Sequence, residues 1–216
     1  MRRWASTRAR AARTALANNP AVRDVGLLHP GVAAFSSKAR ALGTAQVFGL
    51  SPLPATAFSH YQLEQGDDLH DLDGDGFVLV GHELASAFEV KVGDKLTLAR
   101  PAASQRTVCR GGVRETVEEK VADAPTPTEV TVKGILAHER LGRRNLGHVL
   151  VTSYSLARRL DPNQRTLFQI NRHRGSNVDA LRSELGRDFQ LLDERTALLG
   201  ESADERAFRH GVKVLG

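Results

Sequence analysis

Three aspartates at alternate positions form the sharpest chemical motif in the sequence. Asp71, Asp73 and Asp75 stand in the run Asp71–Gly76 (DLDGDG), which matches the first half of an EF-hand calcium loop. In such a loop the carboxylates converge on a hard cation, and a glycine permits the sharp turn. The twelfth position of the loop should hold a bidentate glutamate, and here it holds His82. We therefore expect a polar hairpin turn, and calcium binding by Asp71, Asp73 and Asp75 is the alternative.

Other residues that could do chemistry are scattered. The sequence has eight histidines, and none of them is spaced as H-x-H or H-x-x-x-H. His70 and His82 could meet across a hairpin beside the aspartates, which leaves a transition-metal site as a further alternative. The single cysteine, Cys109, cannot form an internal disulfide, and no base is apparent near it in sequence. We find no catalytic group of residues and no phosphate loop, so we expect a non-catalytic chain without a cofactor.

The positive charge of the chain raises the question of nucleic-acid binding. The formal net charge is +5 and the isoelectric point is about 9.8. However, the arginines are interleaved with 25 acidic residues, and the basic groups lack the aromatic side chains on which bases stack. We expect no nucleic-acid partner. The basic start of the chain is more simply a solvated helix face, or one that lies near anionic lipid headgroups.

The elements that would position these residues are clearest between Phe77 and Leu98. Phe77–Val80 is a short apolar run typical of a buried strand, and Glu83–Phe88 carries the one-sided apolar stripe of a helix. Val92–Lys95 predicts a turn, because glycine and aspartate favour turn backbone. Lys95–Leu98 alternates polar and apolar residues, as a half-buried strand does.

Further elements follow from periodicity and from helix and turn signals. Helices are predicted over Ser6–Ala17 and Asn177–Leu185, the second of them inside a β-α-β unit with strands Phe168–Asn171 and Phe189–Leu192. Strands are also predicted at Val22–Leu28, Gly31–Phe35 and Ala41–Leu50, with a break at His29-Pro30 between the first two. Pro101–Thr128 is the least structured part by composition, although Val113–Val121 could be a hairpin arm.

Four of these stretches together resemble the extracytoplasmic domain of FtsX/MacB-type ABC transporter permeases. The family's order of motifs is matched by Asn19–Val25, by Gly81–Ala85 (GHELA) ahead of Val92–Leu98 (VGDKLTL), by Thr131–Leu136 (TVKGIL), and by His148–Val151 with the helix Tyr154–Leu160. Each motif is short, and their common order carries the resemblance, which spans nearly the whole chain.

The resemblance implies an α+β fold with two subdomains. Residues 1–57 and 165–216 would form a βαβ-containing, porter-like subdomain next to the membrane. Residues 58–164 would form an inserted, β-rich, Sabre-like subdomain. The segments Ser6–Ala17 and Glu201–Leu215 would then be two levers that carry motion to and from the membrane helices.

The resemblance also implies partners and a location. The domain would stand on the extracytoplasmic side of the cell membrane, between transmembrane helices of its own permease. It would work with an ABC ATPase subunit, which hydrolyses ATP elsewhere, and with a second permease copy. Lipid, lipoprotein, peptide, or a periplasmic or cell-wall protein would be the bound substrate or partner. The sequence itself has no uninterrupted apolar stretch of about 18 residues, the length that crosses a bilayer.

A stand-alone soluble binding module for a protein or a polyanion is the alternative. The two classes differ in where the chain ends lie, because a permease domain must bring both ends to one face. We therefore expect labels near Ala5 and Val212 to lie within about 30 Å, the span of a small domain.

Overall fold

The computed structural model describes residues 13–37, 43–53, 60–101, 103–110, 113–120 and 126–176, together with residues 181 and 183. The chain divides into two compact units. Residues 1–21 and 173–216 make up one unit, in which residues 13–17 are helical, and residues 22–172 make up the other. Within the described residues, no helix has the length and apolarity needed to cross a membrane.

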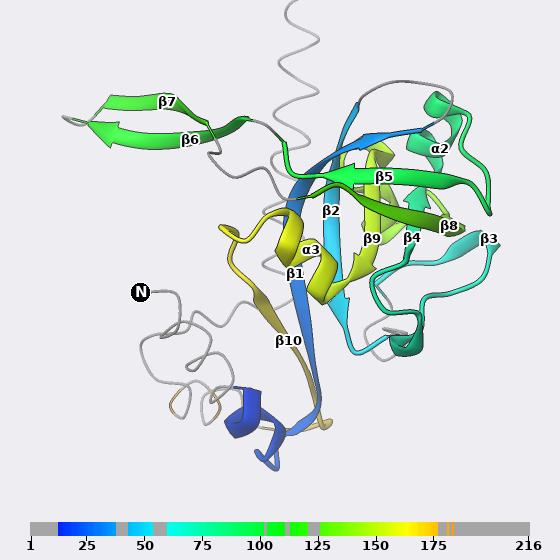
Figure 1. Cartoon of the computed structure of the whole chain (residues 1–216). Helices are drawn as coiled ribbons and strands as arrows, with labels where there is room; N and C mark the ends of the chain where they lie inside the picture. The colour runs from blue at the N-terminus through cyan, green and yellow to red at the C-terminus, as the bar shows by residue number, and fades with distance from the viewer. Residues whose placement is uncertain are drawn as a thin grey trace, which may run out of the picture. The chain divides into compact units, whose positions relative to one another are not determined.

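The larger unit is built on a mixed sheet of eight strands (Figure 1). The sheet contains six antiparallel pairs and two parallel pairs, and the parallel pairs are β2 with β9 and β4 with β8. Its strands are β1 (Val22–Ser36), β2 (Gly43–Ser51), β3 (Leu63–Gly66), β4 (Phe77–Gly81), β5 (Lys95–Ala99), β8 (Thr128–Leu136), β9 (Val149–Ser153) and β10 (Leu167–Arg172). The short helices are α2 (His82–Phe88) and α3 (Tyr154–Leu160), and the 3-10 segments are η2 (Asp71–Asp73) and η3 (Arg140–Gly147). This is a mixed α+β fold, as predicted at that level.

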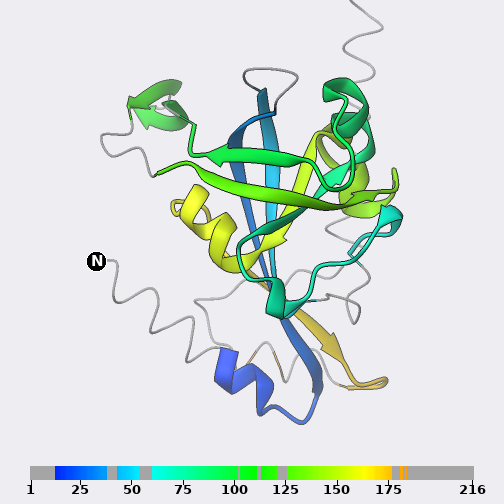
Figure 2. The same ribbon diagram turned by 45° about the vertical axis from the view of Figure 1, so that its right-hand side comes forward.

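Six of the eight strands close into a ring. The hydrogen-bonded order runs β1, β2, β9, β4, β8 and β5, and β5 pairs with β1 again through Phe35 and Leu98. Figure 2 shows β5 and β8 crossing over β1 and β2 to complete it. Strand β10 adds to β1, and β3 adds to β8, outside the ring. A closed ring leaves few unpaired strand edges, and it encloses a core.

The interior of the ring holds the larger apolar cluster. Every strand of the ring contributes side chains to it, and α2 and α3 add Leu84, Leu156 and Leu160. A second cluster packs on the outer face of β2, β4 and β9, where Leu79, Val149 and Val151 point away from the interior. Strands β4 and β9 are therefore buried on both faces, which explains why their sequences are continuous apolar runs without alternation.

The strand, helix, turn and strand predicted between Phe77 and Leu98 are confirmed as β4, α2, a turn and β5. The turn contains Gly93 at φ +91°, a value that favours glycine. The motifs Thr131–Leu136 and His148–Val151, which the resembled family has as strands, overlap β8 and β9, and the helix expected at Tyr154–Leu160 is confirmed as α3.

The predicted break at His29-Pro30 is wrong, because β1 runs without interruption from Val22 to Ser36. On one side, Pro30 pairs with Phe48 of β2. On its other side, the pairing with β10 ends at Leu28 and the pairing with β5 begins at Ala34. The backbone N–H of Val32 points to this open side and donates to Asp161 Oδ2 at 3.3 Å. Pro30, two residues earlier, faces the same side, so its missing N–H costs no ladder hydrogen bond.

The region Pro101–Thr128 is more regular than its composition indicates. Strand β6 (Ala103–Arg110) pairs antiparallel with β7 (Val113–Lys120) in a separate two-stranded sheet, with Cys109 opposite Arg114. The hairpin arm predicted at Val113–Val121 is thus β7. In the β-α-β unit predicted near the C-terminus, the first strand is β10, whereas the helix beyond residues 181 and 183 and the second strand lie outside the described residues.

The compact units have different limits from the two expected subdomains. Strands β1 and β2, from the first expected subdomain, share one sheet with β4, β8 and β9 from the second. Sharing a sheet does not decide which parts move during function, so the division into 1–57 with 165–216 and 58–164 stays a prediction.

Candidate functional site

The run Asp71–Gly76, which we call the aspartate loop, connects β3 to β4 through η2. It is a turn, as expected, but the expected hairpin is wrong. Strands β3 and β4 do not pair with each other, because both of them pair with β8, one antiparallel and the other parallel. The loop therefore carries the chain from one side of β8 to the other, and its polar groups face several elements.

Each aspartate of the loop ties it to a different element. Asp71 Oδ1 accepts a hydrogen bond from the backbone N–H of Leu53 at 2.7 Å, just after β2. Asp73 Oδ2 accepts from Lys133 Nζ of β8 at 2.5 Å, and both side chains are only 17 % exposed. Asp73 also accepts from the backbone N–H of His70 at 2.7 Å. Burial would raise the pKa of Asp73, but the Lys133 ammonium and the His70 N–H outweigh it and hold this pKa below its ordinary value.

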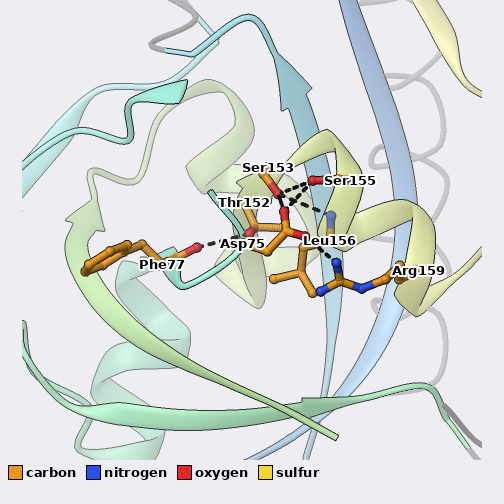
Figure 3. A network of polar contacts seen from close by, with 7 residues as sticks. All are labelled: Asp75, Phe77, Thr152, Ser153, Ser155, Leu156 and Arg159. Atoms are coloured by element: carbon orange, nitrogen blue, oxygen red, sulfur yellow. Dashed lines mark hydrogen bonds and ion pairs between the residues drawn. The ribbon is translucent and has the colours of Figure 1, made fainter. Parts of the chain in front are cut away.

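Asp75 is the centre of the largest polar network of the loop (Figure 3). Its carboxylate accepts hydrogen bonds from the hydroxyls of Ser153 and Ser155, and it forms an ion pair with Arg159. Ser153 in turn caps α3, because its Oγ accepts from the backbone N–H of Leu156 at 3.1 Å. Burial would raise the pKa of Asp75, but the two hydroxyls and the guanidinium together keep the pKa below its usual range.

The same region is joined by a hydrogen bond between neighbouring strands. Thr152 Oγ1, which is fully buried, donates to the carbonyl of Phe77 at 3.0 Å. Gly76 O accepts from the backbone N–H of Thr131 at 2.8 Å. The start of β4, the end of β9, the start of α3 and the middle of β8 are thus held to one loop. This arrangement therefore holds these elements together through one loop.

The three carboxylates point to protein groups and not to a shared centre. Where the structure describes the chain, no group of three His, Cys, Asp or Glu side chains is placed to hold a metal ion. His82 Nδ1 lies 2.7 Å from Glu64 Oε2. His70 contributes its backbone N–H to Asp73. The calcium alternative at Asp71, Asp73 and Asp75 and the metal alternative at His70 and His82 gain no support from this geometry.

Two other histidines are held by internal hydrogen bonds. His29 is 1 % exposed and its Nε2 lies 2.8 Å from the carbonyl of Asp161, so this nitrogen carries the proton. Its Nδ1 lies 3.0 Å from Thr166 Oγ1. Burial lowers the pKa of His60 to about 4, aided by Arg140 and opposed by a hydrogen bond with Gln169. Both rings are thus hydrogen-bonded within the larger unit, His29 as a buried residue and His60 as a half-buried one.

A shallow groove of about 500 Å³ adjoins the network at Arg159. It is lined by Thr126, Pro127, Thr128, Glu129, Arg159 and Leu160. Glu129 Oε1 in its lining lies 2.6 Å from Lys95 Nζ. The side chain of Glu129 is 61 % exposed, and that of Lys95 is 59 % exposed. Arg159 therefore touches the aspartate loop on one side and the groove on the other.

The exposed ion pair at the groove should contribute little to folding. We expect Lys95→Ala to change the free energy of unfolding by less than about 0.5 kcal/mol, because water screens a pair of this kind. Chemical denaturation at low and at 0.5 M salt measures it. A loss of about 2 kcal/mol or more would show that Lys95 has a structural role that its exposure does not indicate.

The aspartates were visible in the sequence, but their partners were not. Lys133, Ser153, Ser155 and Arg159 lie 60 to 84 residues along the chain from the aspartate that each one contacts, and no local pattern connects them to it. One signal was available. Ser153 directly precedes the predicted helix Tyr154–Leu160, in the position where serine is a preferred N-cap.

Comparison with solved structures places this fold among known ones. The periplasmic region of MacB from Actinobacillus actinomycetemcomitans matches with a TM-score of 0.54 and 11% identity, over 81% of this chain and 69% of that one. The extracellular domain of the noncanonic ABC-type transporter YknZ from Gram-positive bacteria matches with a TM-score of 0.51 and 10% identity, over 81% of this chain and 76% of that one. No family model and no curated protein sequence matches the chain.

The chain therefore has the fold of the periplasmic and extracellular domains of MacB/FtsX-type ABC transporter permeases. The resemblance stated from the four sequence motifs is confirmed in this respect.

Proposed function

We propose that this chain is the extracytoplasmic domain of an ABC transporter permease, and that it is a non-catalytic domain that transmits ATP-driven motion. The fold shared with MacB and YknZ domains is the observation that carries the proposal. The domain stands on the outer side of the cell membrane and is attached to its own transmembrane helices. It works with an ABC ATPase, in which ATP is hydrolysed, and with a second permease copy. It binds a lipid, a lipoprotein, a peptide or an extracytoplasmic protein.

The way the chain enters and leaves the larger unit supports this proposal. Val22, its first residue, pairs with Arg172, its last, at one end of β1 and β10. Both connections therefore leave the unit at the same point, as a domain inserted between two membrane helices requires. A stand-alone binding module for a protein or polyanion has no such requirement.

The aspartate loop and the paired strands offer a path by which force could pass through the larger unit. A force applied through β1 and β10 reaches β2 and β9 through backbone hydrogen bonds, and α3 through Asp75 and Ser153. Because the strands close into a ring, each strand of the ring is hydrogen-bonded to a neighbour on both sides, which gives the force a continuous path. A contact with a substrate or partner at one surface is thus transmitted to the paired chain connections at Val22 and Arg172.

The proposal is tested in the full permease, reconstituted in liposomes with its ATPase. Cys109→Ser removes the one cysteine of this sequence, any cysteine elsewhere in the permease is replaced likewise, and Gln65→Cys places a spin label on an exposed position of β3. We expect the label-to-label distance between two permease copies to change when a non-hydrolysable ATP analogue is added. A distance distribution that is the same with and without the analogue would count against motion transmission. A parent protein without membrane helices would favour the stand-alone module.

A further inference from the structure

The hairpin of β6 and β7 forms a sheet of its own (Figure 1). Its two strands pair over their whole length, from Ala103 with Lys120 to Arg110 with Val113. Among the described strands, none pairs with the outer edge of either one. Two strands alone are only marginally stable in water, and a further strand or a packed helix stabilises them. Within the described part of the chain, the hairpin therefore lacks the neighbour that such a ribbon needs.

The outer edges of the hairpin are long and regular. Each strand has eight residues, contains no proline, and keeps its register without a bulge. Short strands, prolines and bulges are the usual means by which proteins prevent an edge from pairing, and charged residues are another. In β6 the charged residues are Arg106 and Arg110, whereas β7 carries both signs. An edge of mixed charge admits a strand whose charges complement it and excludes others.

The register of the hairpin shows which backbone groups of β7 face outward. Arg110 pairs with Val113, so two residues connect the strands, and the pair that flanks such a turn is hydrogen-bonded. Hydrogen-bonded and non-hydrogen-bonded pairs then alternate along the two strands. Arg114, Thr116 and Glu118 belong to the non-hydrogen-bonded pairs, so their N–H and C=O groups point away from β6. A further strand can bond to β7 only through these alternate positions.

A second copy of β7 is the strand that fits this edge. Two copies related by a twofold axis place β7 antiparallel to itself, which closes the contact. Pairing of β7 with β6 of the other copy would leave an edge open for a third copy. Pairing of β6 with itself would gather the arginines of both copies without an acidic residue among them.

Most registers of a contact between two β7 strands set like charges opposite each other. Because the outward positions alternate, the twofold axis passes through a residue and not between two residues. A centre at Arg114, Glu115 or Glu118 sets that residue opposite its own copy. A centre at Val117 sets Glu115 opposite Glu119. Like charges directly opposite each other destabilise a pair of strands.

The remaining centre within residues 114–118 is Thr116, and it gives a complementary contact. It sets Arg114 opposite Glu118 of the other copy, and by symmetry this pair of opposite charges occurs twice. Glu115 then lies opposite Val117, and Thr116 lies opposite its own copy. Pairs of opposite charge and pairs of threonines both stabilise neighbouring strands. The same register also brings the outward backbone groups of the two strands opposite each other.

We propose that the β6–β7 hairpins of two permease copies join edge to edge through β7, antiparallel and centred on Thr116, into one continuous sheet. The hairpin is then an interface between copies outside the membrane, and it gains in the second copy the neighbouring strand that it otherwise lacks. The inference rests on the proposed function, which supplies the second permease copy, and it names the surface at which the two copies meet.

Disulfide cross-linking in the full permease tests the contact. The permease carries Cys109→Ser, lacks its other cysteines, and is reconstituted in liposomes with its ATPase. Thr116→Cys sets two thiols opposite each other in a hydrogen-bonded pair, with Cα atoms about 5.5 Å apart, which a disulfide can span. We expect mild oxidation to link the two copies covalently through this position.

Thr107→Cys is the matched control, because Thr107 lies directly opposite Thr116 within the hairpin but on β6. In the joined sheet the two copies of position 107 are three strand spacings apart, about 14 Å. This distance is too long for a disulfide, so we expect no link from this position.

An exchange of charges separates strand pairing from simple proximity. With Thr116→Cys present, Arg114→Glu sets like charges opposite each other at both ends of the contact. We expect it to slow formation of the linked dimer by about fivefold or more, and Glu118→Arg to do the same. The two substitutions together restore opposite charges, so the double variant should recover the original rate.

The other outcomes would overturn the inference. A link from position 107 in place of 116 would put the contact on β6, and equal links from both positions would indicate random collision. Absence of a link from 116, or a rate that the charge exchange leaves unchanged, would overturn it too. The distance measurement from Gln65 does not involve the hairpin. Failure of the link therefore leaves the proposed motion standing, and a label distance that does not change leaves the hairpin contact standing.

Discussion

Phe35→Ala is expected to lower the free energy of unfolding by about 3–5 kcal/mol, the cost of removing a fully buried phenylalanine. Phe35 is 1 % exposed and lies at the point where the ring of strands closes. There β1 pairs with Gly43 of β2 on one side and with Leu98 of β5 on the other. Its ring packs edge-to-face on Phe88 of α2, with the ring centroids 4.7 Å apart. The substitution thus opens a cavity where β1, β2, β5 and α2 meet.

Denaturant titration of the purified chain measures this loss, with Leu72→Ala as the control. Leu72 is fully exposed, so its truncation should change the free energy by less than about 0.5 kcal/mol. A loss below about 1 kcal/mol for Phe35→Ala would show that β1 and β5 do not enclose this side chain, and the closed ring would then be wrong. Since domains are stable by only about 5–15 kcal/mol, the predicted loss is a large part of the total.

Asp75→Asn is expected to cost about 1–3 kcal/mol at neutral pH, because the substitution leaves charged and hydroxyl donors without their anionic acceptor. The side chain of Asp75 is 25 % exposed, and its partners Ser153, Ser155 and Arg159 have no other carboxylate in the network. Ser153 also caps α3 through Leu156, so the loss should extend to the start of that helix. Denaturation at pH 7 measures the difference.

The pH dependence of this difference follows from the lowered pKa of Asp75. A carboxyl whose pKa is lower in the folded state than in the unfolded state stabilises the fold above its unfolded pKa, about 3.9 for aspartate. This stabilising contribution is lost as the pH falls through the pKa that the carboxyl has in the folded state. The difference in free energy of unfolding between the wild-type chain and Asp75→Asn should therefore be constant from about pH 5 to 8. It should become smaller below about pH 4.

Asp67→Asn is the matched control, because Asp67 is an exposed aspartate in the same connection between β3 and β4. It should change stability by less than about 0.5 kcal/mol at all these pH values. An Asp75→Asn gap that persists undiminished at pH 3 would contradict the ion pair with Arg159 as its source.

Local patterns sufficed to predict the elements of the larger unit. The apolar run at Phe77–Val80, the helical stripe that follows it and the alternating strand at Lys95–Leu98 each depend on neighbours in sequence, and each is present as β4, α2 and β5. Local patterns failed at Pro30. A proline breaks a strand only where its N–H would meet a partner, and the sequence does not reveal that β10 and β5 leave a gap there.

The candidate site shows the same limit. The sequence identified Asp71, Asp73 and Asp75 but assigned them by their spacing either to a hairpin or to a cation. Their partners lie on β8, α3 and the end of β2, and strand order brings them together over long stretches of chain. Closure of the ring through β5, and the left-handed backbone at Leu146, depend on tertiary packing in the same way. Neither has a local sequence signature.

The central claim is that this chain is the outer domain of a membrane permease, and the sequence of its parent gene on both sides of the segment tests it most directly. The account predicts an open reading frame that continues into apolar stretches of about 20 residues before Arg2 and after Gly216, each long enough to cross a bilayer. It also predicts a neighbouring gene or domain with an ATPase phosphate loop. A reading frame that starts at Met1 and stops after Gly216 would contradict the account and leave a stand-alone binding module.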